Sequence, residues 1–434
     1  MGRDRGVPGR IIVLFAAGAL LGMSALHCGG SKSSPPPAPP TRVTAAAGNA
    51  RVVIGWTGIT GVTSYNIYWS TVPGVTKNGG RKITQAADPY VHTGLTNGTT
   101  YYYVVTAVNG NGEGPPSHEV SATPQLIKHT YPVGNQPQDV AIDAAGNVWV
   151  TDNSDNDVIK LGPDGVSVGT YVVDSGPGGI AIDHAGNVWV ADYGDNAVTR
   201  LGPDGTVIGT YAVPGSPEGI AVDGAGNVWV TQTRGVSVAE LAGDGTPLGA
   251  FVVGAYPIGV AIDGMDDVWV LSQHSGPLES TVSRLTPNGA VIGTYTVGRA
   301  SIGIAIDAAG NAWVTNGDDN SVTVVSPGGA PVGTYRVGNM PAGIAIDAAG
   351  YVWVVNFGDD DLYELSPAGT ITGTYPVGNA PQAIAIDAAG DVWVVNWWDN
   401  TVTELVGVAK GPQYFPCRYS PSNACPQFQG GGNW

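Results

Sequence analysis

Short runs of alternating apolar and polar residues fill the chain from Thr41 onward. Val52, Ile54 and Trp56 share one face of an early run. Alternation with a period of two is typical of half-buried strands. No segment beyond the first 27 residues shows the sustained 3.6-residue period of an amphipathic helix. The pattern therefore predicts an all-β protein built from many short strands.

Beyond Gln125 one unit is repeated along the chain. It reads Pro-x-x-Ile-Ala-Ile-Asp-x-x-Gly-Asn-Val-Trp-Val, then an Asp/Asn-rich turn, a strand that ends near Pro-Asp-Gly, and Gly-Thr-Tyr-x-Val-Gly. Successive tryptophans are forty residues apart, except at the fourth interval, which is forty-four; they are Trp149, Trp189, Trp229, Trp269, Trp313, Trp353 and Trp393. A period near forty with four β-type segments per unit is typical of propeller blades. The repeat predicts a seven-bladed β-propeller.

The order of the repeated segments predicts how the ring closes. One Thr-Tyr segment, at 127–133, precedes the first tryptophan, and none follows the last. We therefore expect 127–133 to be the outermost strand of the last blade, paired with 401–406. Pro132, Pro214 and Pro376 fall in or at the end of Thr-Tyr segments, as expected for an outer edge. The Ile-Ala-Ile segments are then expected to be innermost, where small side chains fit.

A leader and a tether precede the first strands. Residues 1–27 have a basic start and an apolar run, which predict a secretory signal peptide. Cys28, followed by two glycines and a polar stretch, resembles the end of a bacterial lipoprotein signal and predicts lipidation of that cysteine. The alternative is ordinary cleavage near Ala25, which leaves Cys28 free. Residues 28–40 are rich in Ser and Pro and are expected to be an extended tether.

Two motifs ahead of the repeats identify a separate module. The first is Trp56, which is expected to be a buried core residue. The second is a Leu-x-x-Gly-x-x-Tyr motif that begins at Leu95, and in such motifs the tyrosine hydroxyl fixes a turn between two strands. On these motifs residues 41–124 resemble a fibronectin type III domain, which implies a β-sandwich that serves as a spacer or adhesion module. The repeats at 125–408 resemble the NHL and virginiamycin B lyase-like propellers, with features of the YVTN type. That resemblance implies the fold more than the function, since propellers carry out unrelated tasks.

Charge and cysteine content limit the partners. The formal net charge of −17 argues against nucleic acid as a partner. Residues 409–434 form a tail that contains Cys417 and Cys425, which are expected to form a local disulfide after export to an oxidising compartment. A metal site there would need further ligands.

Ligand binding is expected where the copies differ on one face of the disk. If the strand order holds, the Asp/Asn-rich turns and the loops leading into each inner strand share that face. Its candidate ligand-binding residues are Tyr193, Tyr256, Phe357, Trp397 and Trp398. Aromatic rings stack on apolar faces while nearby acids and amides form hydrogen bonds, which fits carbohydrate or protein ligands. The alternative is that these rings plug the mouth of the central channel.

The same face is rich in oxygen ligands. Asp152, Asp155 and Asp157, in one turn, come nearest to a calcium site, although no turn matches a complete calcium-binding motif. A solvated acidic turn is the alternative.

The fourth repeat predicts the only acid and base pair that the sequence offers. Its turn after Trp269 is four residues longer than the others and contains His274 and Glu279, with Glu218 of a neighbouring repeat as a third member. The resemblance to virginiamycin B lyase implies a magnesium-assisted lyase that uses histidine and glutamate. The glutamate typical of that family is replaced here by Asp152, Asp192, Gln232, Asn316, Asn356 and Asn396.

Three functions are therefore carried forward. The first is an exported cell-envelope protein, lipid-anchored or secreted, that binds carbohydrate or protein or acts as a scaffold, contacts the membrane through its N-terminal lipid, and does not bind nucleic acid. The second is a streptogramin-lyase-like enzyme. The third is a structural surface protein stiffened by calcium. The sequence requires no cofactor for the first function, whereas Mg²⁺ or Ca²⁺ enters with the other two.

Overall fold

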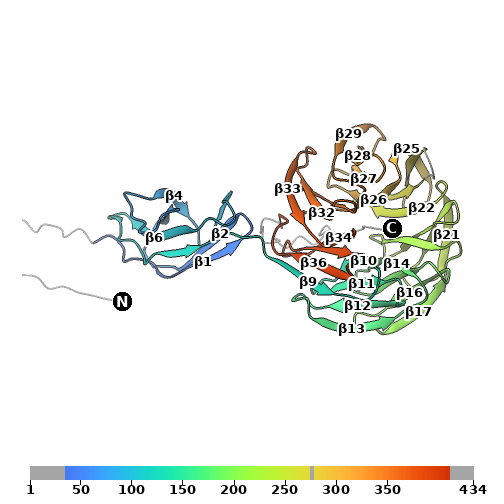
Figure 1. Cartoon of the computed structure of the whole chain (residues 1–434), viewed down its shortest axis with the longest axis horizontal. Helices are drawn as coiled ribbons and strands as arrows, with labels where there is room; N and C mark the ends of the chain where they lie inside the picture. The colour runs from blue at the N-terminus through green and yellow to red at the C-terminus, as the bar shows by residue number, and fades with distance from the viewer. Residues whose placement is uncertain (1–34, 274–277, 411–434) are drawn as a thin grey trace, which may run out of the picture.

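The computed structural model describes residues 35–273 and 278–410. They consist of strands and turns, and no helix in this part of the chain is long and apolar enough to cross a membrane. The chain forms a small sandwich followed by a ring of sheets (Figure 1). The all-β prediction is confirmed.

The sandwich consists of two antiparallel sheets. One contains β1 (Thr41–Gly48), β2 (Arg51–Thr57) and β5 (Tyr90–Thr93), and the other β3 (Ser64–Ser70), β4 (Arg81–Ala86), β6 (Tyr101–Asn109), β7 (Gly112–Glu113) and β8 (Val120–Ala122). Val52, Ile54 and Trp56 are buried between them. The Tyr101 hydroxyl accepts a hydrogen bond from the backbone N–H of Thr96 at 3.0 Å, which is the turn contact expected from the Leu-x-x-Gly-x-x-Tyr motif.

Seven four-stranded antiparallel sheets follow in the described residues, and we number these blades one to seven. Blade one consists of β10 (Pro137–Ile142), β11 (Val148–Asp152), β12 (Asp157–Leu161) and β13 (Ser167–Val172). Blade two consists of β14 (Pro177–Ile182), β15 (Val188–Asp192), β16 (Ala197–Leu201) and β17 (Val207–Ala212). Blade three consists of β18 (Pro217–Val222), β19 (Val228–Gln232), β20 (Ser237–Leu241) and β21 (Pro247–Val252). Blade four consists of β22 (Pro257–Ile262), β23 (Val268–Ser272), β24 (Glu279–Leu285) and β25 (Val291–Arg299). Blade five consists of β26 (Ser301–Ile306), β27 (Ala312–Asn316), β28 (Ser321–Val325) and β29 (Pro331–Arg336). Blade six consists of β30 (Pro341–Ile346), β31 (Val352–Asn356), β32 (Asp361–Leu365) and β33 (Ile371–Pro376). Blade seven is β34 (Pro381–Ile386), β35 (Val392–Asn396), β36 (Thr401–Leu405) and β9 (Lys128–Pro132).

The ring closes by strand exchange. Strand β9 pairs with β36, and the pairing is extended by Val133 N–H donating to Asn400 and Val406 N–H donating to Ile127. The inner strands of neighbouring blades contact one another, and β10 of blade one contacts β34 of blade seven. The predicted pairing of 127–133 with 401–406 and the innermost position of the Ile-Ala-Ile segments are thus confirmed.

Each blade is held to its neighbour by its tryptophan. The seven tryptophans are buried, and Trp149 packs against Val188 and Val190 of blade two. The indole N–H of Trp149 donates to the Asp143 carboxylate at 3.0 Å, and the other six blades repeat this bond. The aspartate also accepts local backbone amides, as expected of an Asp-x-x-Gly turn. One residue therefore fixes both the turn and the tryptophan.

Close approaches between blades require glycine at two recurring positions, one near the axis and one at the rim. In blade two, a Cβ on Gly179 would lie 2.4 Å from the backbone oxygen of Glu218 in blade three. At the rim, a Cβ on Gly165 of blade one would lie 2.0 Å from the Tyr131 ring of β9. Tyr131 also stacks on Trp393 with ring centroids 5.7 Å apart, so this one side chain contacts both blade seven and blade one.

The sandwich joins the ring beside this closure. Gln125 N–H donates to the Gly48 carbonyl at 3.2 Å, and Leu126 packs against the apolar cluster of the last two blades. The chain then enters β9 directly. The segment that closes the ring is thus also the segment that connects it to the sandwich.

Candidate functional site

Two sets of loops share one face of the ring, which we call the upper face. They are the turns between the second and third strands of each blade and the loops that lead into each first strand. In blade two, Tyr193 N–H donates to the Gly176 carbonyl at 3.0 Å, and Gly194 N–H donates to Ser175 at 2.9 Å, which ties one turn to one loop. The prediction that these loops lie together is confirmed. The opposite set of loops forms the lower face.

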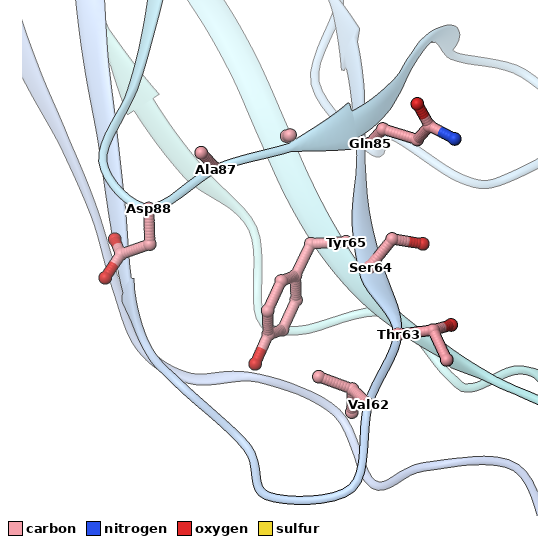
Figure 2. A pocket seen from close by; sticks show the side chains of 8 residues that line it. Val62, Thr63, Ser64, Tyr65, Gln85, Ala87 and Asp88 are labelled. Atoms are coloured by element: carbon pink, nitrogen blue, oxygen red, sulfur yellow. The ribbon is translucent and has the colours of Figure 1, made fainter.

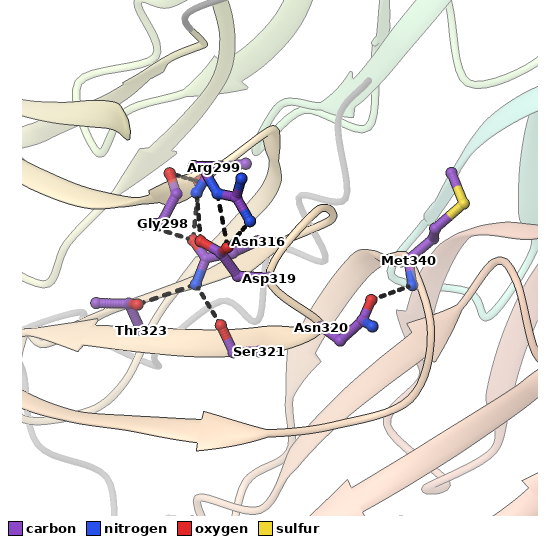
Figure 3. Close-up of polar contacts among 9 residues, drawn as sticks. Gly298, Arg299, Asn316, Asp319, Asn320, Ser321, Thr323 and Met340 are labelled. Atoms are coloured by element: carbon purple, nitrogen blue, oxygen red, sulfur yellow. Dashed lines mark hydrogen bonds and ion pairs between the residues drawn. The ribbon is translucent and has the colours of Figure 1, made fainter. Parts of the chain in front are cut away.

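Most acids of the upper face hold backbone amides. In blades two, five, six and seven the turn carboxylate accepts the amide of the preceding loop; the pairs are Asp195 with Ser175, Asp319 with Arg299, Asp359 with Asn339 and Asp399 with Asn379. Figure 3 shows that Asp319 also receives two bonds from the Arg299 guanidinium, at 2.8 and 2.6 Å. The acid-rich turns are therefore largely occupied in fixing loop conformation.

The next turn residue connects one blade to the next. Its backbone is left-handed, and its side-chain oxygen accepts an amide from the following blade; the residues are Asn156, Asn196, Asn320, Asp360 and Asn400. We call this contact the amide latch, and Figure 3 shows Asn320 bonded to Met340. Asn400 bonds to Gln136 and so latches blade seven to blade one at 2.9 Å. Val236 occupies the position in blade three and has no side-chain oxygen.

The three candidate calcium ligands interact without forming a metal site. Asp152 accepts a hydrogen bond from the Asn135 N–H and one from the Asp155 N–H at 3.3 Å. Burial, together with the charges of Asp152 and Asp155, raises the pKa of Asp157 to about 6. In the described part of the chain, no three His, Cys, Asp or Glu side chains are placed to hold a metal ion.

The end of each second strand carries a second kind of polar contact. In blade five, Asn316 accepts the Gly298 amide and donates to Thr323 at 2.9 Å. In blade two the same position is Asp192, which is fully buried and accepts only the Thr199 hydroxyl at 2.7 Å; its other oxygen has no partner. Burial raises the pKa of Asp192 to about 7, opposed by the Thr199 bond. A carboxylate here is therefore less well accommodated than an amide.

The five candidate aromatic residues do not form one surface. Tyr193, Phe357 and Trp397 occupy the same repeat position and are half-buried. Tyr256 and Trp398 lie elsewhere and are 51% and 72% exposed. The three half-buried rings fit the plugging alternative better than a free ligand platform, whereas the two exposed rings are available to a ligand.

One pocket on the upper face brings two of these aromatics together. It has a volume of about 440 Å³ and lies between blades six and seven; its lining is Met340, Phe357, Gly358, Asp360, Asn379, Ala380, Trp398 and Asp399. Trp397 packs against Trp398 with ring centroids 5.8 Å apart, and its buried indole N–H has no partner in the described residues. The pocket therefore combines an exposed indole with carboxylates and an amide.

Two lining residues were missed in the sequence analysis. Met340 and Asn379 are unremarkable one at a time, because each belongs to a loop that every blade repeats. Met340 does differ from its repeat counterparts and is 46% exposed. An apolar residue at a repeat position that varies between blades was the sequence feature that could have indicated this pocket.

The proposed acid and base group is only partly described. Glu218 lies on inner strand β18 and accepts the Thr233 hydroxyl at 2.7 Å. Burial raises the pKa of Glu218 to about 7, opposed by that bond. Glu279 starts β24, is exposed and pairs with Arg299 across the strands, and it forms no hydrogen bond with Glu218 in the described residues. His274 lies outside the described residues, as do Cys28, Cys417 and Cys425.

A second pocket lies on the sandwich. It has a volume of about 490 Å³, and Figure 2 shows its lining, Val62, Thr63, Ser64, Tyr65, Gln85, Ala87 and Asp88. The Tyr65 hydroxyl already accepts the Ile59 N–H at 2.6 Å, and Asp88 accepts the Trp56 N–H at 2.9 Å. Its polar groups are therefore engaged in fixing loops, and the upper-face pocket is the stronger candidate.

Comparison with known families gives two matches. The model of the fibronectin type III domain matches residues 38–123, and the model of the virginiamycin B lyase family matches residues 118–337, half of the chain. Both resemblances stated from the sequence are thereby confirmed.

Comparison with solved structures points the same way. A streptogramin B lyase structure is 19% identical, covers 64% of this chain and 97% of its own, and superposes with a TM-score of 0.59. A catalytically inactive virginiamycin B lyase from Staphylococcus aureus, solved with quinupristin, is 18% identical, covers 65% of this chain and 99% of its own, with a TM-score of 0.58. At these identities the likeness shows the fold alone.

Curated relatives match over short stretches. An amylopullulanase from Thermoanaerobacter thermohydrosulfuricus is 39% identical over 100 residues, which are 23% of this chain and 6% of that protein. The chain spans at most 19% of the length of the curated relatives that it matches.

Proposed function

The chain belongs to the virginiamycin B lyase family, and from this premise we propose that it is a ligand-binding member of the family, exported to the cell envelope, whose upper-face pocket binds carbohydrate. The observation that carries the proposal is the pocket beside Trp398, where the indole is 72% exposed next to the side chains of Asp360, Asn379 and Asp399. Protein or peptide is the alternative ligand and is an outcome of the test below.

The chemistry of the pocket supports a polar ligand with apolar faces. The Trp398 indole and the Met340 side chain offer flat and flexible apolar surface. Asp360 gives one oxygen to the Ala380 amide, and Asn379 donates to Asp399 at 2.6 Å, so the polar groups are held in place before a ligand arrives. A preordered site of this kind binds with a small ordering cost.

The remaining segments fit a protein displayed outside the cell. On this proposal residues 1–27 direct export, lipidated Cys28 anchors the protein in the membrane or cleavage releases it, and 28–40 separate it from the surface. The fibronectin type III module acts as a spacer and the propeller presents its upper face to the ligand.

Replacing the exposed indole tests the pocket. We expect Trp398→Ala to weaken binding of the best hit from a glycan array by at least tenfold, because the stacking surface is removed. Its Tm should stay within about 1 °C, since the side chain is largely exposed.

A matched variant makes this test specific. Tyr256→Ala also removes an exposed upper-face ring, but one outside the pocket, and should leave binding unchanged. Equal losses in both variants, or hits confined to a peptide array, would contradict a carbohydrate site at Trp398.

One observation supports a second function, a lyase-like enzyme. Glu218 is held beside the ring axis with a pKa raised to about 7 by burial, which suits a proton-transfer group near neutral pH. The described residues do not fit a magnesium site, because no three ligands converge, so any such chemistry would rest on Glu218 and groups near it.

The enzyme function has its own test. If it holds, the chain should consume quinupristin, and Glu218→Gln should lower kcat at least a hundredfold while Glu279→Gln does not. The activity of the unaltered chain should also change with an apparent pKa near 7. No turnover, or equal turnover in Glu218→Gln, would remove this candidate.

A further inference from the structure

One position in the third strand of every blade faces the tryptophan. Its residue pairs directly across from the indole in the antiparallel ladder. In blades one to seven it is Lys160, Arg200, Glu240, Arg284, Val324, Glu364 and Glu404. The position is thus basic in three blades, acidic in three and apolar in one.

Where the residue is basic, its surroundings show what the position accommodates. The Lys160 ammonium lies 4.4 Å from the Trp149 ring centroid and 3.8 Å from the Asp143 carboxylate, and it donates to the Pro203 carbonyl of the next blade at 2.8 Å. In blade four, Arg284 makes the same three kinds of contact. An indole face, a buried carboxylate and a carbonyl of the following blade together form a cation site.

Where the residue is glutamate, blades six and seven supply a partner. Glu364 contacts the Lys410 ammonium at 3.2 Å and the Tyr375 hydroxyl at 3.1 Å. Glu404 accepts the Tyr131 hydroxyl at 2.7 Å. Both tyrosines come from the outermost strand of the same blade, and Lys410 comes from the segment that follows the last strand.

Blade three lacks both kinds of partner. Its outermost strand carries Phe251 in place of the tyrosine, so no hydroxyl reaches Glu240. The Glu240 side chain is buried, with 7% of the residue exposed, and its carboxylate has no hydrogen-bond or ion-pair partner in the described residues. It lies beside Asp223, which is 2% exposed and already accepts the Trp229 N–H. Two buried carboxylates therefore adjoin with no cation between them.

We propose that Glu240 and Asp223, with the Trp229 ring, form a lower-face binding site for an organic cation, an ammonium or guanidinium group. The equivalent positions of blades one, two and four hold such groups from the chain itself, and blade six holds Lys410. A divalent metal fits less well, because only two carboxylates meet here and one is saturated by local bonds.

Two sources can supply the cation. One is a lysine or arginine side chain of a partner protein, which would dock on the lower face as Lys410 does. The other is the chain's own Arg418, the one basic residue beyond Lys410 in the sequence, which lies outside the described residues. Asp266, whose carboxylate accepts the Gly224 amide at 2.9 Å, adds negative charge at this part of the lower face.

Titration of the full-length chain with agmatine, which carries one guanidinium and one ammonium group, tests the site. By calorimetry we expect saturable binding to the unaltered chain, at least tenfold weaker binding to Glu240→Gln and none to Glu240→Lys. The lysine should place its ammonium over Trp229, as Lys160 does over Trp149, and raise the Tm. Asp164→Asn, which removes an exposed lower-face carboxylate from blade one, should bind agmatine unchanged.

Two further variants complete the test. Phe251→Tyr supplies the hydroxyl found in blades six and seven and should weaken binding severalfold without loss of folding. Arg418→Ala should tighten agmatine binding if the tail fills the site and leave it unchanged if a partner does. Absence of saturable binding in both the unaltered chain and Arg418→Ala, binding that survives Glu240→Lys, or displacement of agmatine by equimolar Ca²⁺ would overturn the proposal.

Discussion

Asp192→Asn is expected to stabilise the propeller by roughly 2–4 kcal/mol at pH 8, because it removes a buried charge whose pKa is raised from 3.8 to about 7. Asparagine is the residue at the same position in blades five to seven, where Asn316 and Asn396 each donate to a threonine hydroxyl. In blade two the equivalent threonine, Thr199, is already in place. Thermal unfolding of the full chain at several pH values measures the effect.

The raised pKa of Asp192 predicts how the stabilisation by Asp192→Asn changes with pH. The folded-state pKa of Asp192 lies above the unfolded value, so the protonated carboxyl stabilises the fold below about pH 4, and this contribution is lost as the pH rises through 7. The gain in Asp192→Asn should therefore vanish near pH 4. The reverse change in blade seven, Asn396→Asp, should lower the Tm at pH 8. A gain that is equal at both pH values would show that charge is not its cause.

Tyr131→Ala is expected to destabilise the propeller by about 3 kcal/mol or more. It removes a ring stacked on Trp393, a contact with the Gly165 turn of blade one, and the hydroxyl that bonds to Glu404. The buried Glu404 carboxylate then loses its hydrogen-bond donor, which adds to the cost. The loss should be measured by thermal unfolding and by amide exchange in β9.

The matched variant is Tyr171→Ala in blade one. Tyr171 packs on Trp149 at a centroid distance of 5.6 Å and against the Gly205 turn, so both variants lose similar contacts. Strand β13 continues directly from its own sheet, whereas β9 joins blade seven without a connecting turn. Tyr131→Ala should therefore lose more stability and exchange β9 amides faster. Equal losses would mean that ring closure does not limit stability.

Much of the fold could be predicted from the sequence because each blade repeats the same local rules. The tryptophan period, the Asp-x-x-Gly turns and the unmatched Thr-Tyr segment each predict a feature that the structure confirms. The Gly179 position shows where the reasoning was incomplete. A Cβ on Gly179 would lie 2.4 Å from the backbone oxygen of Glu218, so the close packing of the inner strands depends on this glycine as well as on the Ile-Ala-Ile alanine two residues later.

The candidate site was harder to predict, because its determinants are differences between copies in space. An acidic turn looks the same in sequence whether its carboxylates bind calcium or accept amides, and only the folded structure shows Asp319 and Asp399 bonded to neighbouring loops. The five aromatic candidates illustrate the same limit. Repeat position alone does not reveal that Trp398 is exposed while Phe357 is half-buried. The lack of a partner for the Glu240 carboxylate could be recognised only by comparison with Glu364 and Glu404, whose partners the structure shows.

The path of the chain into β9 has a mechanical consequence. Any pull on the N-terminal side of the molecule reaches the ring through the strand that no covalent turn ties to its sheet. The bond between Gln125 and Gly48 and the packing of Leu126 would resist such a load before the β9 pairing does. If the protein is tethered to a surface under flow, we therefore expect the contacts of Gln125 and Leu126, between the sandwich and blade seven, to break first.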